Sequence, residues 1–339
     1  MPNRFRDGAE PSPAPRTVVL LVNLGTPAAP TPAAVRRYLG EFLHDYRVVE
    51  LSRWLWCPLL HFLILPLRSP RLAKKYAEIW TAQGSPLLAN SQALAQAVQT
   101  QLPELEVRLA MRYGEPSVRA VLRECEQAGR VVVLPLYPQF SASTTASVHD
   151  AVGAELANWR RRPALNLLAD YHLDAAWLQA LADSVRAHWQ AQGRGEQLLM
   201  SFHGLPQAQD RAGDPYASQC RAGAEALEQL LGLRADEWRL SFQSRFGRQQ
   251  WLQPYTDAVL AEMAGAGVRR VDVICPGFAV DCLETLEEIA VDNAARFVSA
   301  GGQALRYIPA LNAAPAHAAA LAALARRALS GDNEPAHAL

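Results

Sequence analysis

The sequence is poor in cysteine and has almost no lysine. Its five cysteines are an odd number among 339 residues and include no CxxC pair, which argues against a disulfide framework and against a zinc knuckle. Only Lys74 and Lys75 are lysines, yet the basic total of 33 equals the acidic total of 33. Because the net charge is zero, we expect no nucleic-acid partner held through its phosphates.

Long apolar runs are also missing. The longest covers residues 54–67 and is interrupted by two prolines and a histidine, so it is too short to cross a bilayer. A buried helix is the default interpretation of such a run. Its basic flanks, Arg53, Arg68 and Arg71, leave two alternatives, the lip of a pocket or peripheral contact with a membrane surface. Residues 1–16 lack the apolar segment of a signal peptide, so we expect a cytoplasmic protein, at most peripheral at the inner face of the membrane.

Short apolar runs alternate with longer segments of helical periodicity from residue 18 onward. This alternation is typical of βα units that build parallel sheets. The sequence contains neither GxGxxG after its first strand nor GxxxxGK[ST], so it lacks a nucleotide fingerprint. We therefore expect an α/β fold with two similar Rossmann-like (flavodoxin-like) lobes and a ligand cleft between them.

Each expected lobe is a four-stranded parallel sheet flanked by helices. The expected strands cover residues 18–23, 106–111, 131–136 and 165–168, then 197–203, 238–243, 271–275 and 305–308. We expect a disordered tail at 1–16, an N-terminal lobe at 17–175 that carries the apolar lip 54–67, a C-terminal lobe at 176–330 that carries a metal site, and a tail at 331–339.

His203 is the best placed of the eight histidines for chemistry. It ends the apolar run 198–202 and precedes Gly204 in a turn. Its imidazole is therefore expected at the carboxyl edge of a sheet, where open α/β folds bind ligands. A hydrogen-bonded turn histidine is the alternative, and position alone does not separate the two.

Four acidic residues follow the strand expected at 271–275. At about 100° per residue, Asp281, Glu284, Glu288 and Asp292 fall on one face of a helix, opposite an apolar stripe. A solvated acidic face is one interpretation. The other is a ladder of carboxylates for a divalent cation or for protons, since imidazole and carboxylate ligands together suit Fe(II).

Hydroxyl residues follow the strand expected at 131–136. Ser141, Ser143 and Thr144 lead into a helix, where hydroxyls and unpaired backbone N–H groups can hold a carboxylate. Ordinary N-capping is the alternative. In the second lobe, Arg245 lies between two aromatic residues after a strand, either as an anion contact or as packing only.

These segments together resemble the bacterial ferrochelatase family, whose members insert Fe(II) into protoporphyrin. The resemblance covers roughly residues 18–329. Its motifs occur in order: Asn-Leu-Gly-Thr-Pro at 23–27, Met-Arg-Tyr-Gly at 111–114, Leu-Tyr-Pro-Gln-Phe-Ser at 136–141, Ser-Phe-His-Gly-Leu-Pro at 201–206, Phe-Gln-Ser-Arg-Phe-Gly at 242–247 with Trp-Leu at 251–252, and Asp-Cys-Leu-Glu-Thr-Leu-Glu-Glu at 281–288.

The resemblance implies a lyase of haem biosynthesis that joins Fe(II) and protoporphyrin IX to form protohaem (haem b) and releases two protons. It implies catalytic and metal-binding roles for His203 and Glu284, with an acidic relay of Asp281, Glu288 and Asp292. We expect porphyrin contacts from Tyr113, Ser141, Ser143, Thr144, Arg245, Trp251 and Phe278.

Cys282 departs from the pattern of some family members, which have a histidine two residues before Glu284. A mechanism that needs a second imidazole there does not apply to this chain. Some members also hold an iron–sulfur cluster through a C-terminal extension, and this sequence has no cysteine after Cys282. We therefore expect no iron–sulfur cluster and no other tightly bound cofactor.

Metal entry into a porphyrin requires ring distortion and the loss of two pyrrole protons. His203 would accept a proton or ligate the metal, and the sequence leaves both roles open. Glu284 would face it across the porphyrin plane. The alternatives are a chelatase for another divalent metal such as cobalt, a non-catalytic haem or porphyrin binder, and coproporphyrin as substrate. The sequence indicates no oligomeric partner.

Overall fold

The computed structural model describes residues 16–247 and 249–331, in two lobes. Of the described residues, the N-terminal lobe comprises Arg16–Leu136, Ser141–Asp170 and Leu321–Gly331, and the C-terminal lobe comprises Tyr137–Phe140 and Tyr171–Ala320. The boundary expected between residues 175 and 176 therefore differs from the observed one, and two segments belong to the lobe that their sequence position does not suggest. Of the tails expected at 1–16 and 331–339, residues 1–15 and 332–339 lie outside the described residues.

The N-terminal lobe is built on a parallel sheet in the order β2-β1-β3-β4. The strands are β1 (Thr17–Gly25), β2 (Glu106–Tyr113), β3 (Arg130–Pro135) and β4 (Ala164–Leu167). Residues 18–22 of β1 are apolar and fully buried. This continuous apolar run is what a parallel strand covered on both faces requires, and it confirms the four-stranded sheet predicted for this lobe.

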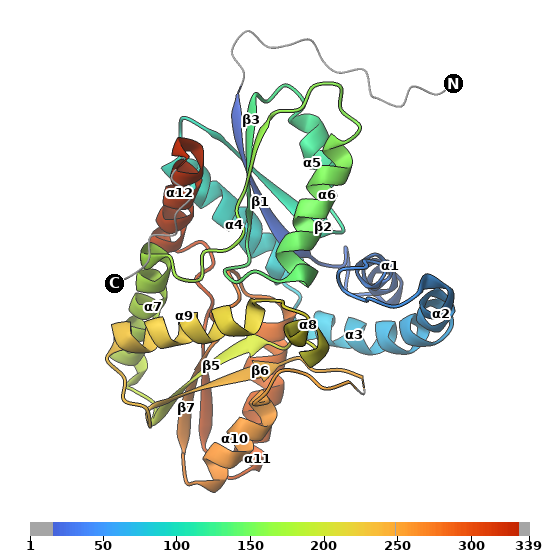
Figure 1. Cartoon of the computed structure of the whole chain (residues 1–339). Helices are drawn as coiled ribbons and strands as arrows, with labels where there is room; N and C mark the ends of the chain where they lie inside the picture. The colour runs from blue at the N-terminus through green and yellow to red at the C-terminus, as the bar shows by residue number, and fades with distance from the viewer. Residues whose placement is uncertain (1–15, 248, 332–339) are drawn as a thin grey trace. The chain divides into compact units, whose positions relative to one another are not determined.

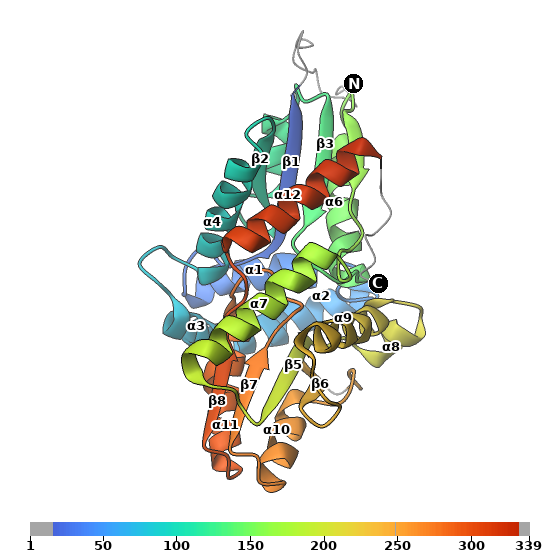
Figure 2. The same ribbon diagram turned by 90° about the vertical axis from the view of Figure 1, so that its left-hand side faces the viewer.

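Helices cover both faces of this sheet. Helix α4 (Pro86–Gln101) and the later part of α12 (Pro315–Ser330) lie on one face, and α5 (Val118–Glu124) and α6 (Ser147–Leu156) lie on the other (Figures 1 and 2). The end of α12 is fixed to the strands because Arg130 Nη1 donates to Leu329 O at 3.1 Å and Asn166 Nδ2 donates to Ala328 O at 2.9 Å. These two hydrogen bonds explain why the chain after Leu321 belongs to this lobe.

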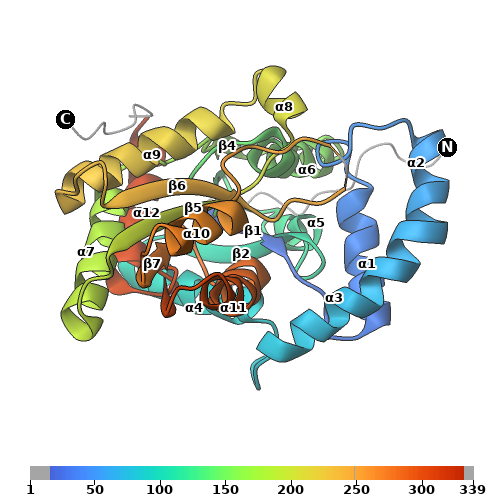
Figure 3. The ribbon, with the colours of Figure 1, turned by 90° about the horizontal axis from the view of Figure 1, so that it is seen from below.

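The segment between β1 and α4 forms helices α1 (Pro32–Leu43), α2 (Arg53–Leu59), the π-helix η1 (Leu60–Ile64) and α3 (Leu65–Ile79), which pack on one another beside the sheet of their lobe (Figure 3). The expected lip at 54–67 is therefore helical but largely not buried. Trp54 is 92% exposed and Phe62 is 83% exposed. We call the exposed apolar residues of this segment the apolar surface: Trp54, Leu55, Leu59, Phe62, Leu63 and Leu67.

Within residues 16–247 and 249–331, no helix has both the length and the apolar character that a membrane span needs. The apolar surface is instead a patch on short helices. Trp56, in the same segment, is buried and its Nε1 donates to Leu43 O at 2.7 Å, which holds α2 against the end of α1.

The C-terminal lobe repeats the design with a parallel sheet in the order β6-β5-β7-β8. Its strands are β5 (Gln197–His203), β6 (Trp238–Gln243), β7 (Arg270–Ile274) and β8 (Ala304–Ile308). Helices α7 (Ala175–Gln192) and α9 (Tyr216–Leu231) pack on each other at one face, and α10 (Thr256–Gly265) and α11 (Ala294–Ser299) lie at the other (Figure 3). The short helix α8 (Gln207–Arg211) follows β5, and the π-helix η3 (Glu284–Asn293) precedes α11 in this lobe. A further π-helix, η2 (Ala142–Ala146), precedes α6 in the N-terminal lobe.

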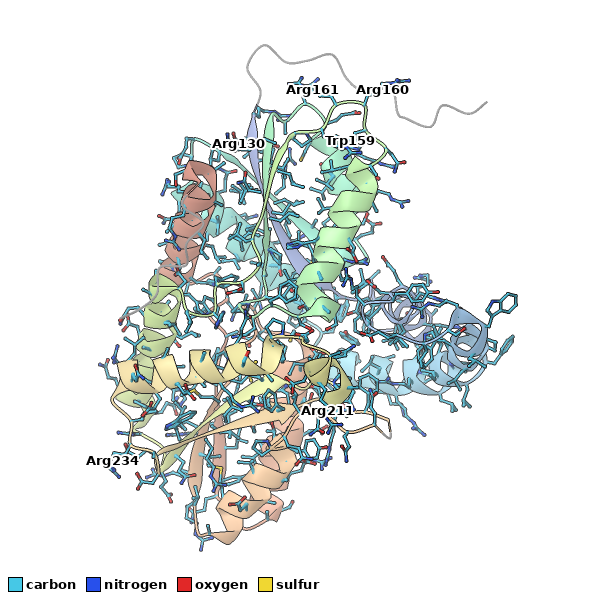
Figure 4. All side chains as sticks on the ribbon, viewed as in Figure 1. Arg130, Trp159, Arg160, Arg161, Arg211 and Arg234 are labelled. Atoms are coloured by element: carbon cyan, nitrogen blue, oxygen red, sulfur yellow. The ribbon has the colours of Figure 1, made fainter. Side chains whose placement is uncertain are left out.

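Arginine takes the surface positions that lysine occupies in many proteins. Arg160, Arg161, Arg211 and Arg234 are all exposed on their own lobes (Figure 4). Trp159, next to Arg160, is buried instead, and its Nε1 donates to the buried Glu155 carboxylate at 3.2 Å. These arginine side chains are therefore solvated at the surface, as is usual for charged residues.

We predict opposite effects of alanine at two glycines of the N-terminal lobe. Gly25 has φ +109°, and a Cβ there would lie 1.8 Å from Tyr113 O, so Gly25→Ala should lower the free energy of unfolding by about 3 kcal/mol or more. Gly153, in α6, has open space around it, so Gly153→Ala should raise that free energy by about 0.5–1 kcal/mol. Denaturant unfolding of both variants checks this, and equal stabilities would contradict it.

Candidate functional site

His203 ends β5 at the carboxyl edge of the C-terminal sheet, as predicted, and is half-buried. Its Nδ1 lies 2.7 Å from Gly204 O. Because a carbonyl oxygen only accepts, Nδ1 carries the hydrogen, and the lone pair of the neutral imidazole is on Nε2. The aromatic ring of Phe278 lies 6.5 Å from the imidazole, centroid to centroid. The side chain is therefore prepared to accept a proton or a metal ion at Nε2.

The turn after His203 is fixed by the neighbouring strand. His203 is in register with Gln243 at the end of β6, and Gly204 N donates to Gln243 O at 2.7 Å. A Cβ on Gly204 would lie 2.6 Å from that same oxygen, so only glycine permits this approach. The backbone of His203 is held from another side, because Tyr216 Oη donates to its carbonyl at 2.9 Å.

Gln243 also holds the start of the acidic segment. Its Nε2 donates to Glu284 O at 2.8 Å, while its Oε1 accepts from Ser201 Oγ at 2.7 Å. The Gln243 side chain is 3% exposed, so these hydrogen bonds are shielded from water. One residue therefore ties the turn after His203 to the first residue of η3, which is Glu284.

Glu288 lies beside both predicted catalytic residues. Its carboxylate accepts hydrogen bonds from Ser244 N at 2.8 Å and from Ser244 Oγ at 2.5 Å. Burial raises the pKa of Glu288, and the charge of Glu284 raises it further against the opposing effects of Ser244 and His203. Because the charges of His203 and Glu284 both shift the pKa of Glu288, the three side chains interact electrostatically.

Cys282 occupies the position where the sequence analysis noted the missing imidazole. It is buried, and its burial, the charge of Glu284 and a hydrogen bond with Glu284 raise the pKa of its thiol. The thiol therefore stays protonated at neutral pH and serves Glu284 as a weak donor. Burial likewise raises the pKa of Cys125 to about 11 and raises those of Cys220 and Cys275.

Asp281 does not stand on the face that the sequence predicted. It precedes the helix, is 5% exposed, and accepts from Tyr307 Oη at 2.6 Å and from Asn312 Nδ2 at 2.7 Å. Its carboxylate holds the loop after β8 against the start of η3. Asp281 therefore has a structural role here, and its membership in an acidic relay stays a prediction.

The α-helical spacing used to predict one acidic face does not apply, because residues 284–293 form a π-helix. Its i→i+5 hydrogen bonds put more residues in each turn than the α-helix assumed for the count. Glu287 is consequently buried at 3% exposure, and Ile289 is fully buried, whereas Leu286 of the expected apolar stripe is only half-buried. Glu284, Glu288 and Asp292 remain half-buried.

Two of the expected porphyrin contacts in this lobe have other partners. Trp251 is 4% exposed, its Nε1 donates to Phe246 O at 2.8 Å, and it pairs with Pro206 in a short bridge. It therefore packs the loop after β6 against the turn after His203 and offers little surface to a ligand. The Arg245 guanidinium is exposed and pairs with Asp257 at 2.7 Å. Phe278 is the expected aromatic contact that lies near His203.

The N-terminal lobe contains a polar cluster that the sequence analysis only partly found. Tyr113, predicted as a porphyrin contact, is 1% exposed, and its Oη donates to Asp45 Oδ2 at 2.8 Å. The same oxygen accepts from Arg112 Nη2 at 2.5 Å and from Ser147 Oγ at 2.6 Å. Tyr113 is therefore a buried member of a cluster around Asp45, and its porphyrin contact stays a prediction.

The expected hydroxyl run is engaged in local capping. Ser141 is buried and its Oγ accepts from Ser143 N at 3.3 Å at the start of η2. Thr144 Oγ1 donates to Ser141 O at 3.5 Å. The capping alternative is therefore present in the structure, and a role of these hydroxyls toward a propionate stays a prediction.

The donor set at His203 suits a divalent transition metal in chemistry, since it combines one imidazole nitrogen with carboxylate oxygens. In the part of the chain that the structure describes, no three His, Cys, Asp or Glu side chains converge as a metal-holding group.

The sequence analysis missed the residues that hold the site in place. Gln243 and Ser244 were within a quoted motif, but only Arg245 was singled out from it. The signal available was the parallel pairing of two strands, since Gln243 stands at the end of β6 where His203 stands at the end of β5. No sequence pattern indicated Asp45, because it lies far in the sequence from β2, whose Arg112 and Tyr113 donate hydrogen bonds to it.

Comparisons with known proteins give one consistent result. A family model described as Ferrochelatase matches residues 16–329. The chain is 53% identical over 321 residues to a ferrochelatase of Aeromonas hydrophila, covering 93% of this chain and 99% of that protein. It is 56% identical over 306 residues to a ferrochelatase of Methylococcus capsulatus, covering 90% of this chain and 94% of that protein.

Solved structures agree on the fold. SirB from Bacillus subtilis with Fe3+ superposes with a TM-score of 0.55 at 11% identity, covering 94% of this chain and 99% of that one. DR2241 from Deinococcus radiodurans, described as similar to chelatases, gives a TM-score of 0.53 at 13% identity, with 92% of this chain and 55% of that one covered. At such identities these similarities concern the fold alone, and they agree with two Rossmann-like lobes.

We predict that the Asp45 cluster makes stability depend on pH. Burial tends to raise the pKa of Asp45, but the hydrogen bonds from Ser147, Arg47 N and Tyr113 and the charge of Arg112 outweigh it and lower the pKa. The stabilisation is therefore present above the unfolded-state pKa of 3.8 and is lost as pH falls through the lower folded-state value.

Asp45→Asn should lower the free energy of unfolding at pH 7 by about 1.5–3 kcal/mol, with a smaller difference in acid. Asp150→Asn is the matched control, because that carboxylate is 55% exposed and pairs only at the surface with Arg47, so its effect should stay within about 0.5–1 kcal/mol. Denaturant unfolding at several pH values measures both, and a pH-independent loss in Asp45→Asn would contradict the assignment.

Proposed function

The chain belongs to the ferrochelatase family, and from that membership we propose that His203, Glu284 and Glu288 form the group that receives Fe(II) and removes the porphyrin protons. The enzyme is a lyase of haem biosynthesis that inserts Fe(II) into protoporphyrin IX, with protohaem and two protons as products. The observation that carries the residue assignment is the electrostatic proximity of Glu288 to both His203 and Glu284.

His203 is proposed to accept a pyrrole proton at Nε2. Gly204 O accepts the hydrogen of Nδ1 in the neutral imidazole, and it accepts the same hydrogen in the imidazolium. Protonation at Nε2 therefore breaks no hydrogen bond of the side chain. An imidazole in this position is a common general base in enzymes.

Glu284 and Glu288 are proposed to supply the carboxylates of the site. Metal insertion releases two protons from the pyrrole nitrogens, so a second acceptor is needed besides His203. Glu288 has a raised pKa, which makes it a better proton acceptor than an exposed glutamate. Asp292 lies further along η3 and is half-buried, so it is the proposed next member of the relay, and Asp281 is retained as its proposed first member.

Phe278 is proposed to contact the porphyrin macrocycle next to His203. The contacts expected from Tyr113, Ser141, Ser143, Thr144 and Arg245 are retained as proposals. The contact expected from Trp251 is retained as well, although only 4% of this residue is exposed. A tightly bound cofactor and an iron–sulfur cluster are not part of the proposal.

The apolar surface is proposed to contact the cytoplasmic face of a lipid bilayer. Trp54 and Phe62 are exposed aromatic residues on short helices, as in segments that insert at a membrane interface. Arg71 and Lys74, further along α3, are exposed cations that would favour anionic headgroups, and each such residue near the surface contributes about 1 kcal/mol. The porphyrin, which is itself apolar, would then be supplied at the same location.

The enzymatic proposal predicts large losses in two variants. Turnover of protoporphyrin IX with Fe(II) under anaerobic conditions, followed by porphyrin absorbance, should fall by about 10²–10⁴-fold in His203→Ala and in Glu284→Ala. Glu262→Ala, which removes an exposed carboxylate of the same lobe, is the control and should keep wild-type turnover.

Three results separate the alternatives. Partial recovery of His203→Ala by added imidazole supports a proton acceptor rather than a fixed metal ligand. Full turnover in His203→Ala would remove this residue from the proposed site. A comparison of Fe(II), Co(II) and Zn(II) tests the metal, and stoichiometric binding without turnover would contradict the enzymatic assignment.

The membrane proposal predicts that the wild-type protein sediments with vesicles containing phosphatidylglycerol. The double variant Trp54→Ser and Phe62→Ser should lose most of this association, because it removes two exposed aromatic side chains. Val298→Ser, which changes a 51% exposed apolar residue of the C-terminal lobe, is the control. Equal sedimentation of the double variant and the wild type would overturn the proposal.

A further inference from the structure

Two histidines of the N-terminal lobe face each other outside the proposed catalytic group. His44 follows directly after α1, and His61 lies in η1. Their Nε2 atoms are 2.8 Å apart, and their ring centroids are 5.0 Å apart at an interplanar angle of 37°. Two histidines that are 17 positions apart in the sequence thus place their Nε2 atoms within hydrogen-bond distance of each other.

Two neutral imidazoles in this arrangement hold one hydrogen between their Nε2 atoms. When that hydrogen moves to Nδ1 of the ring that carries it, both Nε2 lone pairs become available to a metal ion. Two nitrogens bound at 2.0–2.1 Å to a tetrahedral Zn(II) are about 3.3 Å apart, so the rings need to separate by about half an ångström and to turn until both lone pairs point at the ion. His61 is exposed and can make this adjustment. The exposure also gives an ion a direct path from solvent.

The other nitrogen of His44 has a partner of the kind that ligating histidines use. Cys57 Sγ lies 3.9 Å from His44 Nδ1. A histidine that binds a metal through Nε2 carries its hydrogen on Nδ1 and donates it to a neighbouring acceptor, which orients the ring. The Cys57 sulfur is placed to accept that hydrogen.

The groups around His44 and His61 indicate which class of cation the two imidazoles would bind. The Arg53 guanidinium is close enough to His44 to act on it through its charge. The same Arg53 guanidinium repels a cation, and Arg36 lies close by, since its Nη2 donates to His61 O at 3.2 Å. Neutral imidazole donors with no carboxylate bonded to them favour Zn(II), Ni(II) or Cu(II) over Mg(II) or Ca(II).

We propose that His44 and His61 form a binding site for a late first-row divalent cation such as Zn(II), with water completing its coordination. Two protein ligands are consistent with the finding that no three potential ligands converge in the described ranges of the chain. A cation bound there joins the end of α1 to η1, and so fixes the base of the apolar surface. The site is independent of the proposed function, because it shares no residue with the catalytic group.

The test measures Zn(II) binding to the full chain by equilibrium dialysis. His203→Ala and Glu284→Ala are introduced first, so that the catalytic group does not contribute. This parent should bind one Zn(II), and addition of His61→Ala should weaken binding by about tenfold or more. His172→Ala, a half-buried histidine of the other lobe, is the matched control and should leave binding unchanged. Because His61 is exposed, its replacement should not unfold the protein.

A second measurement identifies the residues directly. Diethyl pyrocarbonate acylates unprotonated imidazole nitrogens, and mass spectrometry locates the modified histidines. In the wild-type chain, Zn(II) should protect His44 and His61 from modification. Equal Zn(II) binding by the parent and its His61→Ala derivative, or unchanged acylation of both histidines with Zn(II) present, would overturn the proposal and leave a simple imidazole hydrogen bond.

Discussion

The close approach of two backbones at the end of the C-terminal sheet is the constraint on which the site depends. Gly204 N donates to Gln243 O, and the position has no room for a Cβ. The side chain of the same Gln243 reaches the backbone of Glu284. The sheet register therefore determines where the imidazole and the first carboxylate stand, and neither depends on a flexible loop for its position.

The strands could be predicted from the sequence because parallel strands covered on both faces leave a continuous apolar run. Residues 18–22 are such a run, and they lie fully buried in the centre of their sheet. The lobe boundary could not be predicted in the same way. Its location depends on hydrogen bonds such as that from Asn166 to Ala328, which join segments 162 residues apart and leave no local pattern.

The candidate site was predicted at the residues that carry chemistry and missed at the residues that hold them. His203 follows an apolar run, so its place at the sheet edge could be derived from the sequence. The acidic face could not, because η3 has π-helical bonding and the count assumed an α-helix. Asp281 precedes η3, so the count along a helix does not describe its position. Ser244 was overlooked because its hydrogen bonds to Glu288 arise only when β6 and η3 are brought together.

The buried thiols have a consequence for an enzyme that handles Fe(II). Ferrous iron reacts with oxygen to give peroxide, and peroxide oxidises cysteine through the thiolate. Cys125, Cys220, Cys275 and Cys282 are buried with raised pKa values, so they carry almost no thiolate at neutral pH. Even Cys282, which interacts with the proposed metal-binding Glu284, is therefore protected from peroxide formed by Fe(II) and oxygen. We expect the buried cysteines to resist oxidation to sulfinic acid when the enzyme meets oxygen.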